Sequence, residues 1–170
     1  MTSKIFIKRL NHSITVEGQI LINEFFVTFS RFECALKASG FAIGDAERVN
    51  PNWDTFTSSV RDAFDSEPRS KIQTKAIEYL TNNLPRIQNF ENGQLGWRER
   101  TFEPNVPLIN RLSLSIRDIR NNLFHGGKFN GNYQEDVSRN FILLKHSIEI
   151  LNHWLELSLP VKRKFLENIV

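Results

Sequence analysis

The segment Arg120–Gly127, RNNLFHGG, combines residue types that could act on a phosphodiester. His125 can exchange a proton near neutral pH, and Arg120 keeps its charge and can bind a phosphate through two parallel hydrogen bonds. Cleavage of RNA through its own 2′-hydroxyl needs a proton acceptor, a proton donor and a cation that offsets the developing charge, and it needs no metal. The same residues also suit an ordinary helix end, which basic side chains and glycine commonly close.

A helix over about 106–125 is expected to carry this segment. Its apolar residues recur every three or four positions, the spacing of one buried helix face. That stripe consists of Leu108, Ile109, Leu112, Ile116, Ile119 and Leu123. Arg117 and Arg120 lie together on an adjacent face, because residues three apart are neighbours on a helix. We therefore expect both arginines beside the core rather than inside it.

The pattern Arg-Asn-x-x-x-His at the end of an internal helix resembles the signature of the HEPN superfamily. Arg120, Asn121 and His125 match it. The segment FSRFECALK, Phe29–Lys37, resembles a Phe-Glu-x-x-Leu-Lys element of prokaryotic HEPN proteins of defence and toxin type. The resemblance covers roughly 15–40 and 106–158.

This resemblance implies a helical bundle that dimerises through its motif helices, so that two Arg-His pairs face one cleft. It implies a metal-independent endoribonuclease that leaves 2′,3′-cyclic phosphate and 5′-hydroxyl ends, with no cofactor, as a toxin or antiviral-defence effector. His125 would be the acid-base residue, Arg120 the phosphate stabiliser, and Asn121 an orienting residue. An antitoxin protein is a further partner that this class implies. Some HEPN domains are inactive, so the alternative is a non-catalytic module that binds RNA, a nucleotide or a protein.

Glu33 points to a site independently of the resemblance. On the helix expected over about 13–39 it falls inside the apolar stripe, where an ionised carboxylate is costly unless it is paired. Arg120 or Arg117 is the expected partner, and Glu33 would then support the catalytic set. The alternative is a carboxylate that reaches solvent at the edge of the bundle.

Basic residues concentrate between Trp97 and Lys128. This segment contains six basic and three acidic residues, so its net charge equals the net charge of +3 of the whole chain. Such a local field attracts phosphate, although it also fits a solvated helix face. The residues expected to bind RNA are Arg117, Lys128, Arg98, Arg100 and Trp97. Trp97 could stack on a base, or it could pack on the bundle.

The remaining pattern predicts an all-α protein, an up-and-down bundle of about five to six helices. The expected helices are about 13–39, capped by Ser13, then 51–65, 68–83, 106–125 and 133–158, with a short one after Pro160. Residues 1–170 are expected to form one HEPN-like domain, with an irregular insertion at about 85–107. A two-stranded element inside 86–104 stays open as an alternative, but the sequence pattern does not support it.

Several other features limit the classes of protein and site that the sequence suggests. The only cysteine, Cys34, is expected to be buried, and it suits a reducing, cytoplasmic setting. The chain holds no apolar run long enough to span a membrane and no apolar stretch typical of a signal peptide. His146, Glu149 and His153 share one helix face and form a weaker candidate for a metal site.

Overall fold

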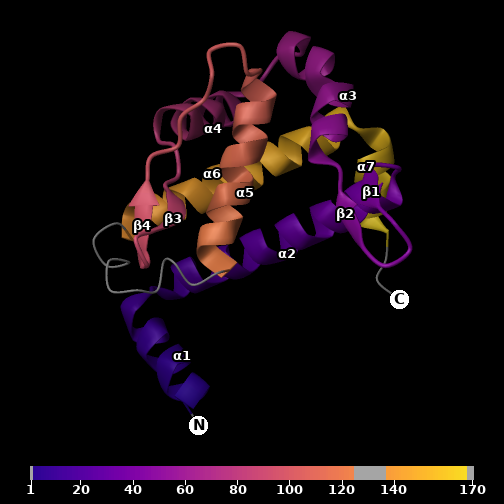
Figure 1. The fold of residues 1–170 in the computed structure, drawn as a ribbon. Coiled ribbons are helices and arrows are strands. Elements are labelled where there is room, and N and C mark those ends of the chain that lie inside the picture. Colours follow the sequence, from indigo (N-terminus) through magenta and orange to yellow (C-terminus); the bar gives the residue numbers. More distant parts are fainter. Residues whose placement is uncertain (1, 125–136, 168–170) are drawn as a thin grey trace.

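In the computed structural model, residues 2–124 and 137–167 are described, and most of them are helical (Figure 1). The helices are α1 Thr2–Ser13, α2 Val16–Ala38, α3 Trp53–Ser66, α4 Lys71–Asn82, α5 Leu108–Phe124, α6 Val137–Leu157 and α7 Leu159–Leu166. The strands are β1 Ala42–Gly44, β2 Val49–Pro51, β3 Ile87–Glu91 and β4 Gln94–Arg98. The predicted helices are therefore present, but the described chain is mainly α rather than all-α.

The first part of the chain differs from the prediction. Residues 2–13 form a separate helix, α1, and Ser13 is its last residue rather than the cap of the next helix. Thr15 caps α2 instead, because its extended backbone lets the side-chain oxygen accept a hydrogen bond from the Gly18 N–H at 3.1 Å. Two potential caps lie close together in this sequence, and the predicted boundary rested on the wrong one.

Local capping explains where the middle helices begin. Asn52 accepts a hydrogen bond from the Thr55 N–H at 3.1 Å and so starts α3. Ser70 and Gln73 form a reciprocal capping box at the start of α4. Both helices lie within a few residues of the predicted ranges, since these caps depend only on neighbouring residues.

The segment expected to be irregular contains an antiparallel hairpin, β3–β4. Asn92 and Gly93 form its two-residue loop, with φ of 50° and 77°. Positive φ at both central residues is what a type I′ turn requires, and Asn-Gly favours that turn strongly. The prediction of an irregular insertion was therefore wrong for residues 87–98, where the alternative of a two-stranded element is present and this dipeptide was its local signal. A shorter hairpin, β1–β2, follows α2.

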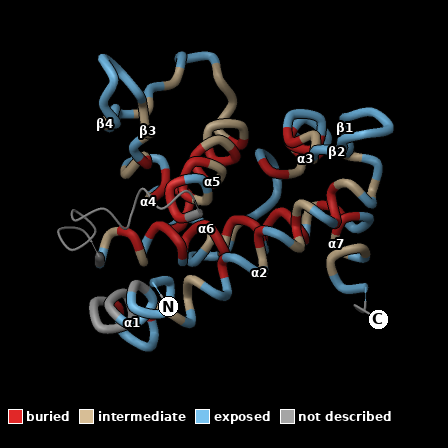
Figure 2. Tube along the Cα trace, turned by 60° about the horizontal axis from the view of Figure 1, so that its bottom comes forward, coloured by how far each residue is buried: buried red, intermediate tan, exposed pale blue. Residues whose placement is uncertain are grey.

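The core lies between α2, α3, α4, α5 and α6, whose buried residues are red in Figure 2, and Val161 of α7 adds to it. Aromatic rings fill its centre: Phe32 stacks on Trp53 with 5.4 Å between ring centroids, and Phe56 and Trp154 pack edge-on against Trp53. α2 and α6 approach closely at Gly18, which is buried against α6. This packing fixes α2 and α5 as the walls of the site described below.

The exposed faces give two further findings. Cys34 is exposed, so the prediction of a buried thiol was wrong: it lies on the side of α2 opposite the core residues Phe32 and Leu36. Among the described helices, none is long and apolar enough to span a membrane.

Candidate functional site

A polar groove lies between α2, the β1–β2 hairpin, the start of α3 and the C-terminal half of α5. It encloses about 810 Å³ of empty space, part of which is open solvent. We call it the arginine groove. Its lining residues are Phe29, Glu33, Arg48, Asn50, Pro51, Trp53, Arg117, Arg120 and Asn121. It brings three of the predicted site residues of α5 together with Glu33, and it adds a third guanidinium from the hairpin.

Arg120 is held in place from two sides. Its guanidinium carbon lies 5.5 Å from the centroid of the Phe29 ring, and its Nη1 donates a hydrogen bond to Asn121 Oδ1 at 2.9 Å. The aromatic face stabilises the cation, and the amide oxygen fixes the orientation of the fork. Asn121 therefore contacts the arginine that precedes it. Arg117 lies about one turn earlier on α5 and lines the same groove.

Glu33 lines the groove but does not form the expected ion pair. Its Oε1 accepts a hydrogen bond from the indole Nε1 of Trp53 at 3.2 Å. Among the ion pairs between described residues, none joins Glu33 to Arg117 or Arg120. The prediction was correct in bringing these groups to one site and wrong about the direct partner. Trp53 is buried with a single N–H donor, and the half-buried Glu33 is the acceptor that satisfies it.

Arg48 belongs to the groove and was missed by the sequence analysis. The turn that carries it is organised by Asp45, whose Oδ1 accepts hydrogen bonds from the N–H groups of Glu47 and Arg48 at 2.9 and 3.0 Å. These two backbone hydrogen bonds lower the pKa of the Asp45 carboxyl below its usual value. The run Gly44–Arg48, GDAER, was a local signal for this turn, but nothing local relates Arg48 to α5.

Close backbone packing also fixes this turn. A Cβ on Gly44 would lie 1.9 Å from the carbonyl oxygen of Arg48. Only glycine allows the two strand ends to approach this closely. Arg48 therefore faces the groove from a constrained hairpin rather than from a long loop.

The other residues expected to bind RNA lie elsewhere. Trp97 and Arg98 are on the β3–β4 hairpin, which lies on the opposite side of α5 from β1–β2 (Figure 1). Arg100 is engaged in a bidentate ion pair with Asp118 of α5, whose side chain is 12% exposed. Arg100 also lies 5.5 Å from the ring centroid of Phe102. Arg100 therefore attaches the segment after β4 to α5, and its expected role in RNA binding stays a prediction.

Two predicted residues cannot be placed. His125 and Lys128 lie outside the described residues. The described part of the motif is Arg120 and Asn121, and His125 follows Phe124, the last described residue of α5, in the sequence.

The histidines of α6 are core residues. His146 and His153 are buried, and burial is the first cause that lowers the pKa of each below its usual value, followed by the nearby Lys75 for His146 and Arg69 for His153. The Nε2 of Gln73 donates a hydrogen bond to Nδ1 of His153 at 3.0 Å, so the proton of the neutral His153 ring lies on its Nε2. Within the described part of the chain, no cluster of three or more histidine, cysteine or carboxylate side chains could hold a metal.

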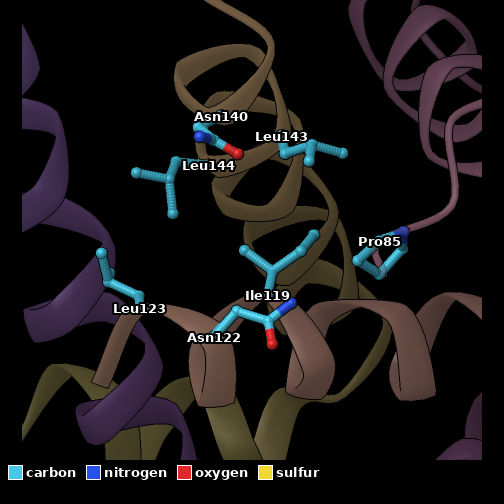
Figure 3. Close-up of a pocket in the computed structure, with 7 residues that line it drawn as sticks. All are labelled: Pro85, Ile119, Asn122, Leu123, Asn140, Leu143 and Leu144. Carbon is cyan, nitrogen blue, oxygen red and sulfur yellow. The ribbon is translucent and has the colours of Figure 1, made fainter. Parts of the chain in front are cut away.

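A second cavity, of about 320 Å³, lies on the other side of α5 and has a mostly apolar lining (Figure 3). Its residues are Pro85, Ile119, Asn122, Leu123, Asn140, Leu143 and Leu144. The Asn122 amide donates to the backbone carbonyl of Arg86 at 2.7 Å, so it ties α5 to the segment before β3. Because none of the described residues that line it is charged, this cavity is less suited to phosphate than the arginine groove.

Comparison of the chain with protein-family models, with curated proteins and with solved structures finds no match. The likeness to HEPN proteins thus stays a prediction from the motif, and the site is interpreted from its own geometry.

Proposed function

We propose that this protein is a HEPN-type, metal-independent endoribonuclease that binds single-stranded RNA in the arginine groove. The observation that carries the proposal is the groove itself: among the described residues, Arg48, Arg117 and Arg120 line one open space with a single carboxylate, Glu33. Such a set favours binding of an anionic polymer, because each guanidinium can donate two hydrogen bonds to one phosphate. The finer expectation of a HEPN-like bundle belongs to this proposal, as does a role in toxicity or antiviral defence.

The charges of Arg48 and Arg117 are available for a ligand. Among the ion pairs between described residues, none uses Arg48 or Arg117. Glu33, the only acidic side chain among the described residues of the lining, accepts the Trp53 N–H instead. Because the three cations come from α5 and from the β1–β2 turn, an RNA backbone lying in the groove would be held from both sides.

The chemistry of the proposal follows from these residues. A base removes the proton of the 2′-hydroxyl, the 2′-oxygen attacks the adjacent phosphorus, and the bond from phosphorus to the 5′-oxygen breaks. The leaving oxygen takes up a proton, which gives a 2′,3′-cyclic phosphate and a 5′-hydroxyl. We assign the proton transfer to His125 and the stabilisation of the charged phosphorane to Arg120, which Phe29 and Asn121 orient.

The proposal is tested with purified protein and single-stranded RNA in the presence of a chelator. Cleavage is expected with cyclic phosphate ends, while DNA of the same sequence stays intact because it lacks the 2′-hydroxyl. His125→Ala should lower the rate roughly 10²–10⁴-fold, the range for an acid-base group, and Arg120→Ala by a comparable factor. Arg86→Ala is the matched control: it removes one charge from an exposed surface ion pair with Glu99 outside the groove. Unchanged cleavage by His125→Ala, or cleavage that requires a divalent metal, would refute the mechanism.

A non-catalytic RNA-binding module is the second candidate, and one observation favours it: the described groove contains the phosphate-binding groups, whereas the acid-base role rests on His125 alone. RNA affinity separates the two candidates. Arg48→Ala and Arg117→Ala should each weaken binding and lower the slope of log K against log salt by about 1, as for the loss of one phosphate contact. If the wild type binds with this dependence on Arg48 and Arg117 but never cleaves, the binding module is the function.

A further inference from the structure

The solvent-facing side of α2 carries a regular seam that is distinct from the arginine groove. Its residues are Val16, Ile20, Asn23, Val27, Ser30 and Cys34. They are spaced alternately by four and three positions, which places them on one stripe, as in the contact line of paired helices. All six are exposed, with Val16 66%, Ile20 61% and Val27 53% exposed. Three exposed β-branched apolar residues on one such stripe favour burial against a partner.

α1 presents a second exposed surface on the same chain. It extends away from the other helices (Figure 1), and its Ile5 and Ile7 are 52% and 51% exposed. A helix of 12 residues is only marginally stable by itself in water, so it gains most from packing against another element. The structure thus contains a helical arm and a helical seam that both expose apolar side chains.

The charges of these two surfaces are complementary. α1 contains Lys4 and Lys8 and has no acidic residue, whereas Glu17 and Glu24 are exposed directly beside the seam of α2. We propose that this seam is the docking surface for a second copy of the chain, whose basic α1 packs along α2 of its partner. A two-fold arrangement places both arms on both seams at once, so the seam and one side of α1 are covered by the same contact.

This interface differs from the dimer that the resemblance to HEPN proteins implies, which uses the motif helices. The groove side of α5 presents Arg117, Arg120 and Asn121, which are polar or charged and suit a ligand better than an apolar contact. On α2, Glu33 lines the groove whereas Cys34 lies on the seam, so pairing through the seam leaves the groove open to solvent. The inference does not depend on RNA cleavage.

The test is the molar mass of the full chain in solution, measured by light scattering during gel filtration at micromolar protein. The wild type is expected at twice the chain mass of 19.8 kDa, and Ile20→Glu at the single-chain mass. The substitution should weaken association by at least about tenfold, because it buries an unpaired charge in the contact. Ile72→Glu on α4 is the matched control, since Ile72 has the same 61% exposure as Ile20 and lies outside the seam. Circular dichroism confirms that both variants stay folded.

Charge reversal tests the contribution of α1. Lys4→Glu with Lys8→Glu should weaken association, and adding Glu17→Lys with Glu24→Lys in the same chain should restore it. A wild type that stays monomeric overturns the inference, as does a dimer that Ile20→Glu and Ile72→Glu affect equally. A dimer that is insensitive to charge reversal on α1 also overturns it. Because no RNA is present, these results are independent of the ribonuclease assay.

Discussion

Arg100 and Asp118 offer a direct test of whether an arginine near the predicted motif serves the fold or the ligand. Arg100 donates two hydrogen bonds to the Asp118 carboxylate, and the two side chains are 19% and 12% exposed. A hydrogen bond to a charged group contributes about 1.5–3 kcal/mol, and removing one member of a fully buried pair costs about 3–5 kcal/mol. Because both side chains keep some contact with water, we expect Arg100→Ala to lower the free energy of unfolding by about 2–3 kcal/mol.

The measurement is urea or thermal unfolding followed by circular dichroism. For a chain of this size the loss corresponds to a fall in Tm on the order of 4–12 °C. Arg98→Ala is the control, since it removes an exposed arginine two positions earlier and should change the free energy of unfolding by less than about 0.5 kcal/mol. Asp118→Ala combined with Arg100→Ala should cost less than the sum of the two single changes, because the pair is lost only once.

RNA binding completes this test. At a temperature where Arg100→Ala is still folded, its affinity for RNA should equal that of the wild type, because Asp118 engages Arg100 and neither residue is among those that line the arginine groove. The reasoning is refuted if Arg100→Ala keeps the stability of the wild type and loses RNA affinity. That result would return Arg100 to the RNA-binding set.

Three further predictions follow from the structure. Burial lowers the pKa of His146 and His153, so the unfolded state takes up protons before the folded state as the pH falls. The free energy of unfolding should therefore be constant above the ordinary pKa of 6.5 and fall below it, by at most about 1.4 kcal/mol per pH unit for each histidine. A flat profile from about pH 7 to pH 5 would contradict this. Gly18→Ala would place a Cβ 2.3 Å from Cζ of Phe141, so it should lower the free energy of unfolding by about 1–3 kcal/mol, as overpacking does, and an added Phe141→Leu should recover part of the loss in the same denaturation assay. Glu33→Gln keeps an acceptor for its indole partner, so the free energy of unfolding should change by less than about 0.5 kcal/mol. RNA affinity should rise, because Glu33 is the only carboxylate among the described lining residues of the groove, and weaker binding would instead show that this carboxylate positions an arginine.

The helices could be predicted because their signals are local. The apolar stripe of α5 and the capping residues Asn52 and Ser70 act within a turn or two of the backbone, so the sequence is sufficient to place them. The hairpin at Asn92–Gly93 was equally local, and the prediction missed it because strand alternation was sought and the turn was not. The error at Ser13 has a similar cause, since Thr15 lies only two residues away.

The sequence by itself also determined which residues of α5 share a face, and it placed Arg117 and Arg120 on one face beside the core. Only the tertiary structure decided what lies across from that face. It placed Arg48, which precedes Arg120 by 72 positions in the sequence, in the same groove. It also paired Glu33 with the Trp53 indole and Arg100 with Asp118. Helical periodicity gives the direction of a side chain about its own axis, but an ionic partner is chosen by which elements pack together and at what distance. Those choices arise from burying the whole core at once, and therefore no short pattern in the sequence contains them.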